Sequence, residues 1–149
     1  ASRAVSVSCL GGLIRQADVQ RGSIDHALAI AVPRTYIRRG PRVWPADPTS
    51  SYYDGDGRST GPLAYSMRFA IPKSVNLNSL GLTANWLMVA KAMQDYGVYI
   101  VDVAGIFNPC IYTEYPAAFS FGSALRDASG GQDTHFPKLW SRLQYVDWT

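Results

Sequence analysis

Residues 24–33 alternate between large apolar and small side chains, and this period of two predicts a β-strand. Proline cannot donate a hydrogen bond to a β-ladder, so Pro33 should end the strand. The larger side chains share one face of it: Ile24, His26, Leu28, Ile30 and Val32. Residues 65–72 repeat the pattern and also stop at a proline, so the two strands could be neighbours in one sheet.

Residues 83–96 have the composition of a helix, with Thr83 placed to cap its beginning and Gly97 placed to end it in a left-handed turn. The next residues, 98–103, are apolar on both faces of a predicted strand, which is typical of the centre of a sheet. We expect a further strand over 110–116 and a strand or short helix over 139–148.

A long stretch between residues 34 and 64 is rich in Gly, Pro, Asp and Ser, and only residues 42–44 look extended within it. Long loops in compact domains are often functional. Together these patterns predict one α+β domain over residues 1–149, mostly an antiparallel, sandwich-like sheet with one packed helix around 83–96.

Composition supports a folded domain, because 47% of the 149 residues are hydrophobic and 17% are charged. The net charge of +3 is concentrated in one short loop at residues 34–42, which lacks the basic stripe that nucleic-acid binding needs. No stretch is long and apolar enough to predict a membrane span. The chain begins without methionine, as expected of a processed chain or a part of a larger precursor.

Cys9 and Cys110 are the only cysteines, and they lack the paired spacing of a zinc site. They could be two buried thiols or one disulfide. Few lysines and many Tyr, Ser, Thr and Gly residues favour an exported protein, so we expect the disulfide.

His26 permits two interpretations. It could be a core histidine whose ring nitrogens bond a backbone carbonyl and a neighbouring hydroxyl, or it could be catalytic. Asp25 points to the opposite face of the predicted strand and cannot orient it, so Asp102 is the better partner. Asp102 is predicted on an inward face, where an ion pair with an arginine is the favoured interpretation and a catalytic role is the alternative. With Glu114 it forms the pair of acids that glycoside hydrolysis requires.

Other catalytic and cofactor motifs are absent from the sequence, and we predict no cofactor. Residues 54–59, DGDGRS, begin like a calcium loop, but Arg58, Ser59 and Tyr65 stand where that loop needs a ligand, a glycine and a glutamate. A tight polar turn is therefore expected there, with Asp54 and Asp56 as weak calcium candidates.

The long loop also carries aromatic and arginine side chains of the types enriched in binding sites. The candidate ligand-binding residues are Arg42, Trp44, Tyr52 and Tyr53. Flat aromatic rings of this kind stack on sugars. Trp44 could instead fill the edge of the core.

Several motifs, in the order GLIR, GSIDHAL, RVWPA, MRFAIP, AKAMQDYGVYIVD and FPKLWSRLQYV, resemble a scattered group of exported bacterial domains, many of them actinobacterial and most without an assigned function. The resemblance covers residues 11–103 and the C-terminal end. It implies an extracellular setting and gives no catalytic residue. The segments DPTSSYYDGDG and FNPCIYTEYP depart from the pattern, so any binding role of these loops would be particular to this chain.

These observations predict an extracellular, non-catalytic binding or assembly module, with a polysaccharide or another cell-surface glycan as the expected partner. One alternative is a small glycan-directed hydrolase that uses Asp102, Glu114 and His26. A second is a structural protein that self-associates in a filament, phage tail or surface layer, for which low charge and many tyrosines would suit buried contacts between copies.

Overall fold

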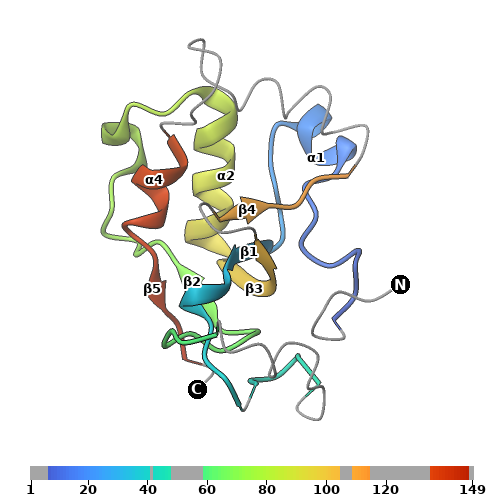
Figure 1. Ribbon diagram of the computed structural model, residues 1–149. Helices are drawn as coiled ribbons and strands as arrows, with labels where there is room; N and C mark the ends of the chain where they lie inside the picture. The colour runs from blue at the N-terminus through green and yellow to red at the C-terminus, as the bar shows by residue number, and fades with distance from the viewer. Residues whose placement is uncertain (1–6, 41, 48–58, 105–108, 115–134, 148–149) are drawn as a thin grey trace.

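In a computed structural model, two parallel strands form the centre of the protein: β1 (Leu28–Pro33) and β3 (Val98–Ala104) (Figure 1). The structure describes residues 7–40, 42–47, 59–104, 109–114 and 135–147. The antiparallel partners are β2 (Arg68–Ala70) beside β3, β5 (Gln144–Tyr145) beside β2, and β4 (Cys110–Ile111) on the free side of β1. The order is β4-β1-β3-β2-β5. The α+β class is confirmed, although the described strands form one mixed sheet instead of two facing sheets.

The predicted alternation holds in β1. Leu28, Ile30 and Val32 are fully buried and belong to the main core cluster. Ala29 and Ala31 occupy the other face and are also buried, because the N-terminal segment packs closely over it. The Ala29 N–H donates to the carbonyl of Gly12 at 3.0 Å, so the two backbones lie directly against each other.

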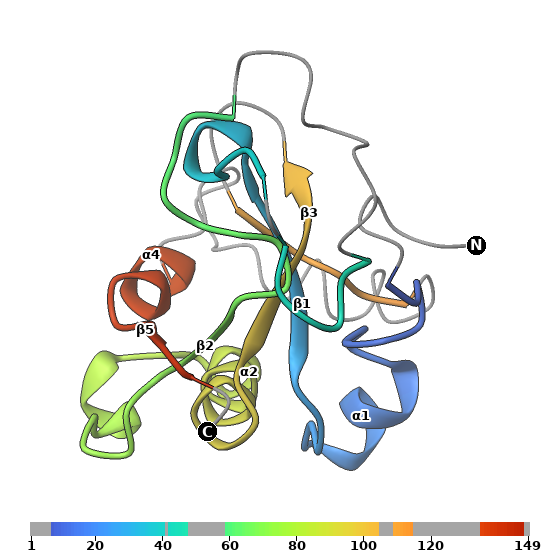
Figure 2. The ribbon, with the colours of Figure 1, turned by 90° about the horizontal axis from the view of Figure 1, so that it is seen from below.

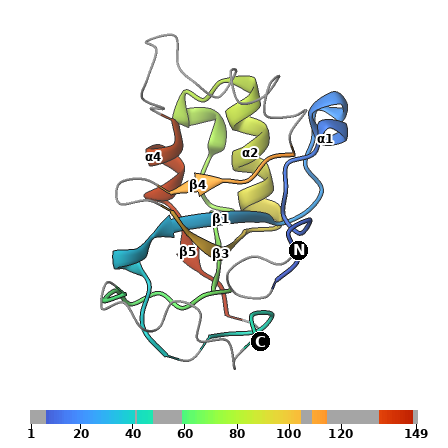
Figure 3. The ribbon, with the colours of Figure 1, turned by 45° about the vertical axis from the view of Figure 1, so that its right-hand side comes forward.

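Helix α2 (Ala84–Asp95) confirms the predicted helix and packs on the core face of the sheet. The Thr83 side chain accepts the N–H of Trp86 at the beginning of the helix, as expected of a cap. Helix α4 (His135–Trp140) lies beside α2, so the C-terminal stretch contains both a short helix and a strand, β5. Figure 3 shows α2 and α4 on one side of β1 and β3, and residues 34–40, 42–47 and 59–66 running along the other.

Helix α1 (Gln16–Arg21) stands apart from these two helices. Figure 2 shows it on one side of β1 and β3, with α2 and α4 on the opposite side. Two short 3-10 helices, Arg34–Tyr36 and Leu77–Leu80, complete the described elements. None of the helices that the structure describes is long and apolar enough to cross a membrane.

Two local predictions are corrected. The strand expected over residues 65–72 is only β2, because Ser66 has a φ of 63° and the chain turns there before it pairs with β3. This strand is also not a neighbour of β1, since β3 lies between them. Residues 42–44 form no strand, and Val43 instead donates its N–H to the Tyr65 carbonyl at 3.2 Å.

Gly97 confirms the predicted left-handed turn after α2, with a φ of 83°. A Cβ at this position would lie 2.7 Å from the carbonyl oxygen of Phe69, closer than van der Waals contact allows. We therefore expect Gly97→Ala to lower the free energy of unfolding by about 2 kcal/mol, from backbone strain and the forced shift of β2. Chemical denaturation would measure this loss, and an unchanged midpoint would contradict the close approach of the two backbones.

Candidate functional site

His26 lies just before β1 and is held by two acceptors. Nδ1 is 3.0 Å from the carbonyl oxygen of Ala27, and Nε2 is 3.1 Å from Oδ2 of Asp18. Both partners of the ring are therefore acceptor oxygens of the protein itself. The side chain is 29% exposed, so His26 is a half-buried histidine bonded to a carboxylate and not the core histidine with a hydroxyl partner that we expected.

Asp18 is the partner that the sequence analysis missed. Its side chain is buried in α1 and accepts the backbone N–H of Arg15 at 2.8 Å and the guanidinium of Arg21 at 2.7 Å, in addition to His26. Burial by itself raises the pKa of Asp18, but these three hydrogen bonds outweigh it and hold the pKa below its ordinary value. Asp18 thus ties the beginning of α1 to the residues that lead into β1. Asp18, at the third position of α1, accepts the backbone N–H of the N-cap residue Arg15, which is one half of a capping box.

The sequence analysis predicted that Asp25 is not the partner of His26, and the structure agrees. Its carboxylate is 59% exposed and lies 3.3 Å from Nε of Arg21. The neighbouring positions 25 and 26 therefore bond different groups, although both take part in the network around Arg21.

Asp102 and His26 do not come together. A bulge in β3 leaves Val101 without a partner, so Asp102 stands opposite Ala31 and not on the inward face with Ile100. The residues are then roughly 15 Å apart along the strand direction. The Asp102 carboxylate accepts the N–H of Val103 at 2.8 Å and forms no ion pair with the described residues, which corrects the prediction of an arginine partner.

Glu114 lies at the opposite end of β1 from Asp102. Its Oε2 accepts the N–H of Gln16 at 2.9 Å, at the beginning of α1. Because Cys110 stands opposite Ala31 in an antiparallel pair, Glu114 lies roughly 10 Å or more from Asp102. This exceeds the separation that carboxylates acting on one glycosidic bond use, so the predicted acid pair is not assembled.

The predicted disulfide is wrong. Cys9 lies in a turn of the N-terminal segment and Cys110 begins β4, and the two cysteines are not close and are not bonded to each other. Pairing with β1 holds Cys110 opposite Ala31, while Cys9 lies in the turn before Gly12, whose carbonyl accepts the N–H of Ala29.

Tyr52, Tyr53, Asp54 and Asp56 fall outside the described residues. Within the described ranges, no three histidine, cysteine or acidic side chains gather closely enough to hold a metal ion.

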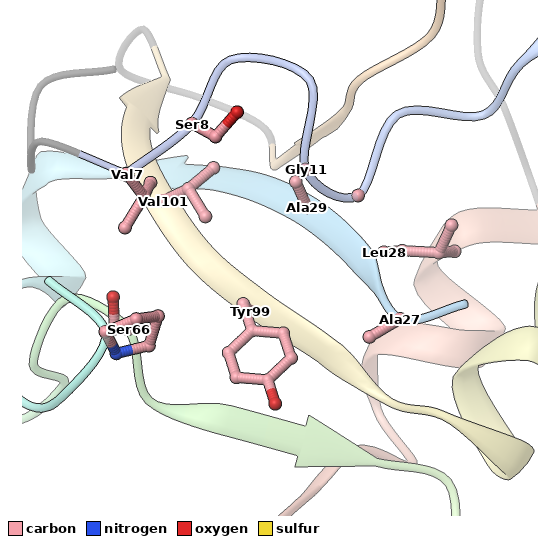
Figure 4. Close-up of a pocket in the computed structure, with 11 residues that line it drawn as sticks. Val7, Ser8, Gly11, Ala27, Leu28, Ala29, Ser66, Tyr99 and Val101 are labelled. Carbon is pink, nitrogen blue, oxygen red and sulfur yellow. The ribbon is translucent and has the colours of Figure 1, made fainter. Parts of the chain in front are cut away.

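A cavity with a volume of about 440 Å³ lies on the sheet face that does not carry α2 (Figure 4). Its floor is formed by Ala29 of β1 with Tyr99 and Val101 of β3, one wall is the N-terminal segment, and Ser66 lies at the other end. The described residues that line it are Val7, Ser8, Gly11, Gly12, Ala27, Leu28, Ala29, Pro45, Ser66, Tyr99 and Val101. We name it the sheet-face pocket.

Hydroxyl groups supply the polar side-chain atoms of this lining. Ser66 is fully buried, and its Oγ has no hydrogen-bond partner in the described structure. Burial raises the pKa of the Tyr99 phenol, an effect partly offset by the nearby charge of Arg68. The phenol therefore remains a protonated hydrogen-bond donor at neutral pH.

Of the loop candidates that the structure describes, Trp44 directly precedes the pocket residue Pro45, and Arg42 does not line the pocket. Trp44 is 72% exposed, so it does not fill the edge of the core. Arg42 is buried, with its guanidinium carbon 5.2 Å from the centre of the Tyr65 ring. Sequence reasoning found this loop but not the rest of the pocket; the signal available was the row of alanines in β1, whose small side chains leave room above them.

The geometry defines an α+β domain with an open, mostly apolar pocket on the outer face of its sheet. Comparison with known proteins finds no matching family model, no matching curated protein and no matching solved structure.

Proposed function

We propose that this chain is an extracellular, non-catalytic binding module that holds a polysaccharide in the sheet-face pocket. The observation that carries the proposal is this pocket, together with the exposed Trp44 one residue away from its wall at Pro45. Its volume of about 440 Å³ lies in the range of small-ligand sites and suits one or two sugar rings.

The chemistry of the lining favours binding over catalysis. Among the described residues of the lining there is neither a carboxylate nor an imidazole, and the histidine and acids that the sequence suggested for hydrolysis are dispersed and bonded elsewhere. Apolar surface with a few hydroxyl groups matches a sugar ring, which presents C–H faces and hydroxyl edges. The extracellular setting rests on the resemblance to exported domains.

A glycan array probed with the whole chain tests the proposal, and incubation of each bound glycan with the protein tests for turnover. Binding without turnover is expected. Cleavage of a bound glycan would favour the hydrolase alternative, and no binding to any glycan would overturn the proposal. Light scattering of the same sample would detect self-association, which is the third candidate function.

Trp44→Ala should weaken binding of the best array ligand by about tenfold or more, because an exposed indole ring offers a large stacking surface. The melting temperature should change little, since the ring is mostly in solvent. Tyr145→Ala is a matched control: it removes an exposed ring from β5, outside the pocket. Isothermal titration calorimetry would compare the three proteins, and equal losses in both variants would show that Trp44 has no specific role.

A further inference from the structure

The floor of the sheet-face pocket presents apolar surface to a ligand. Ala29 of β1 and Val101 of β3 have only aliphatic side chains to contribute to it. The backbone groups of Ala29 are already paired, because its N–H donates to the carbonyl of Gly12 at 3.0 Å and its carbonyl accepts the N–H of Tyr112 at 3.3 Å. A polar group of a ligand that lies on this floor therefore finds no unpaired backbone group at Ala29.

The polar side chains among the described lining residues are hydroxyls. Ser8 is exposed on the N-terminal wall, and Tyr99 is half-buried on the floor. Ser66 is fully buried, so its hydroxyl is closed to a ligand in this structure. None of these lining residues is charged, and an ionised group would lose its water here without gaining a counter-charge from them. The lining thus favours an uncharged ligand that brings few hydroxyl groups to the floor.

This lining distinguishes between sugars. A pyranose carries a hydroxyl at most of its carbons, and a hydroxyl pressed against an apolar floor loses water without gaining a partner. Replacing that hydroxyl by a hydrogen on a methyl group, or covering it with an acyl ester, removes the penalty and adds apolar contact. Figure 4 shows Ser8 and Tyr99 on either side of Val101, so hydroxyls at two edges of a ring that covers Val101 would face them.

We infer that the ligand is an uncharged glycan whose sugar carries an apolar substituent, and that this substituent lies on the floor of the sheet-face pocket. The methyl group of a 6-deoxy sugar and the acyl group of an esterified sugar both provide this chemistry. The inference rests on the proposed function and specifies its substrate class. A free fatty acid is the less favourable apolar ligand, because it would bring a carboxylate that the described lining does not pair.

Calorimetric titration of the whole chain with two matched pairs of neutral ligands tests the inference. Methyl α-L-fucoside and methyl α-L-galactoside differ only in the hydroxyl at carbon six. Acetylated xylo-oligosaccharide and its alkali-treated form differ only in the acetyl esters. The wild type should bind the apolar member of one pair about tenfold or more tightly than its partner. The pair that shows this preference identifies the substituent as a deoxy methyl group or an acyl group.

Ala27→Leu provides the second readout, because Ala27 lines the pocket and is only half-buried. The larger side chain takes up apolar space, so affinity for the preferred ligand should fall about tenfold or more. Ala17→Leu is the matched control: it makes the same change at an exposed position of α1, outside the pocket. Val7→Thr serves if Ala27→Leu does not fold. It keeps the shape of a half-buried lining residue but adds a hydroxyl, so the preference within the pair should shrink.

The remaining outcomes also decide the question. Equal affinities within both pairs, or a best array ligand that carries neither deoxy nor acyl groups, would overturn the inference and leave the proposed function intact. An unchanged preference in folded Ala27→Leu or Val7→Thr would place the substituent outside the sheet-face pocket and would overturn the inference as well. Binding of sodium laurate but of no glycan would overturn both proposals in favour of an acyl-chain site. If neither laurate nor any glycan binds, the proposed function fails and the inference fails with it.

Discussion

Replacing Asp18 with alanine is expected to lower the free energy of unfolding by about 3 kcal/mol. The carboxylate caps the first turn of α1 through Arg15, and it accepts bonds from Arg21 and His26 in a buried position. Its removal leaves the cap open and the Arg21 and His26 side chains without their shared acceptor. Urea denaturation would measure the loss.

Asp18→Asn is the conservative control. The amide oxygen can still accept the N–H of Arg15, but it carries no charge to attract Arg21 and His26, so about half of the loss is expected. A double-mutant cycle with His26→Ala isolates the bond between the two side chains. Additive losses would contradict the coupling that their distance of 3.1 Å implies.

The same group predicts how stability depends on pH. The pKa of Asp18 is lower in the folded protein than its ordinary value of 3.8, so the folded state binds this proton less readily than the unfolded state. The stabilisation by Asp18 is then fully present above the unfolded pKa and is lost as the pH falls through the folded pKa. The difference in stability between the wild type and Asp18→Asn should therefore shrink below about pH 4. A constant difference between pH 7 and pH 3 would show that the carboxylate makes no ionic contribution.

Gly12→Ala should destabilise the protein by about 3 kcal/mol or more, through two effects that act together. Gly12 has a φ of 73°, where an added Cβ strains the backbone. That Cβ would also lie 2.6 Å from the backbone nitrogen of Ala29 and 2.8 Å from its Cβ, so the N-terminal segment would have to move away from β1. Because Gly12 lines the sheet-face pocket, glycan affinity should fall as well.

Gly22→Ala separates the two effects, since Gly22 has the same φ of 73° but no atom within 4 Å of an added Cβ. Only the backbone strain remains there, about 1 kcal/mol. Thermal and chemical denaturation of both variants would measure the difference, which reports the close approach of Gly12 to β1. Equal losses would show that the N-terminal segment does not pack on Ala29 in solution.

Both experiments bear on the proposed function, because the sheet-face pocket is assembled from segments that are far apart in the chain. The N-terminal segment supplies one wall, β1 and β3 supply the floor, and Ser66 lies at the far end. A change that lifts the N-terminal segment should therefore reduce affinity together with stability. Trp44→Ala should reduce affinity alone, and this contrast distinguishes damage to the scaffold from loss of a ligand contact.

Local features of the chain could be predicted from the sequence because they depend on neighbouring residues. Alternation at period two places Leu28, Ile30 and Val32 on the core face of β1, and the cap at Thr83 with the glycine at 97 sets the limits of α2. The spacing at which apolar residues recur determines whether a segment forms a strand or a helix, wherever that segment lies in the fold. These elements predicted the α+β class, and the Gly, Pro, Asp and Ser content around Trp44 predicted a loop there.

The tertiary structure decided which segments meet. Contacts between distant segments produce no periodic pattern of apolar residues, so they could not be predicted from the sequence. The parallel alignment of β1 with β3, and the bulge that turns Asp102 away from Ile100, separated the proposed catalytic residues. The same packing brought Asp18 to His26, and kept Cys9 and Cys110 apart. It also buried Ser66 with an unfilled hydrogen bond beside the sheet-face pocket, an arrangement that depends on contacts across the fold and not on local propensity.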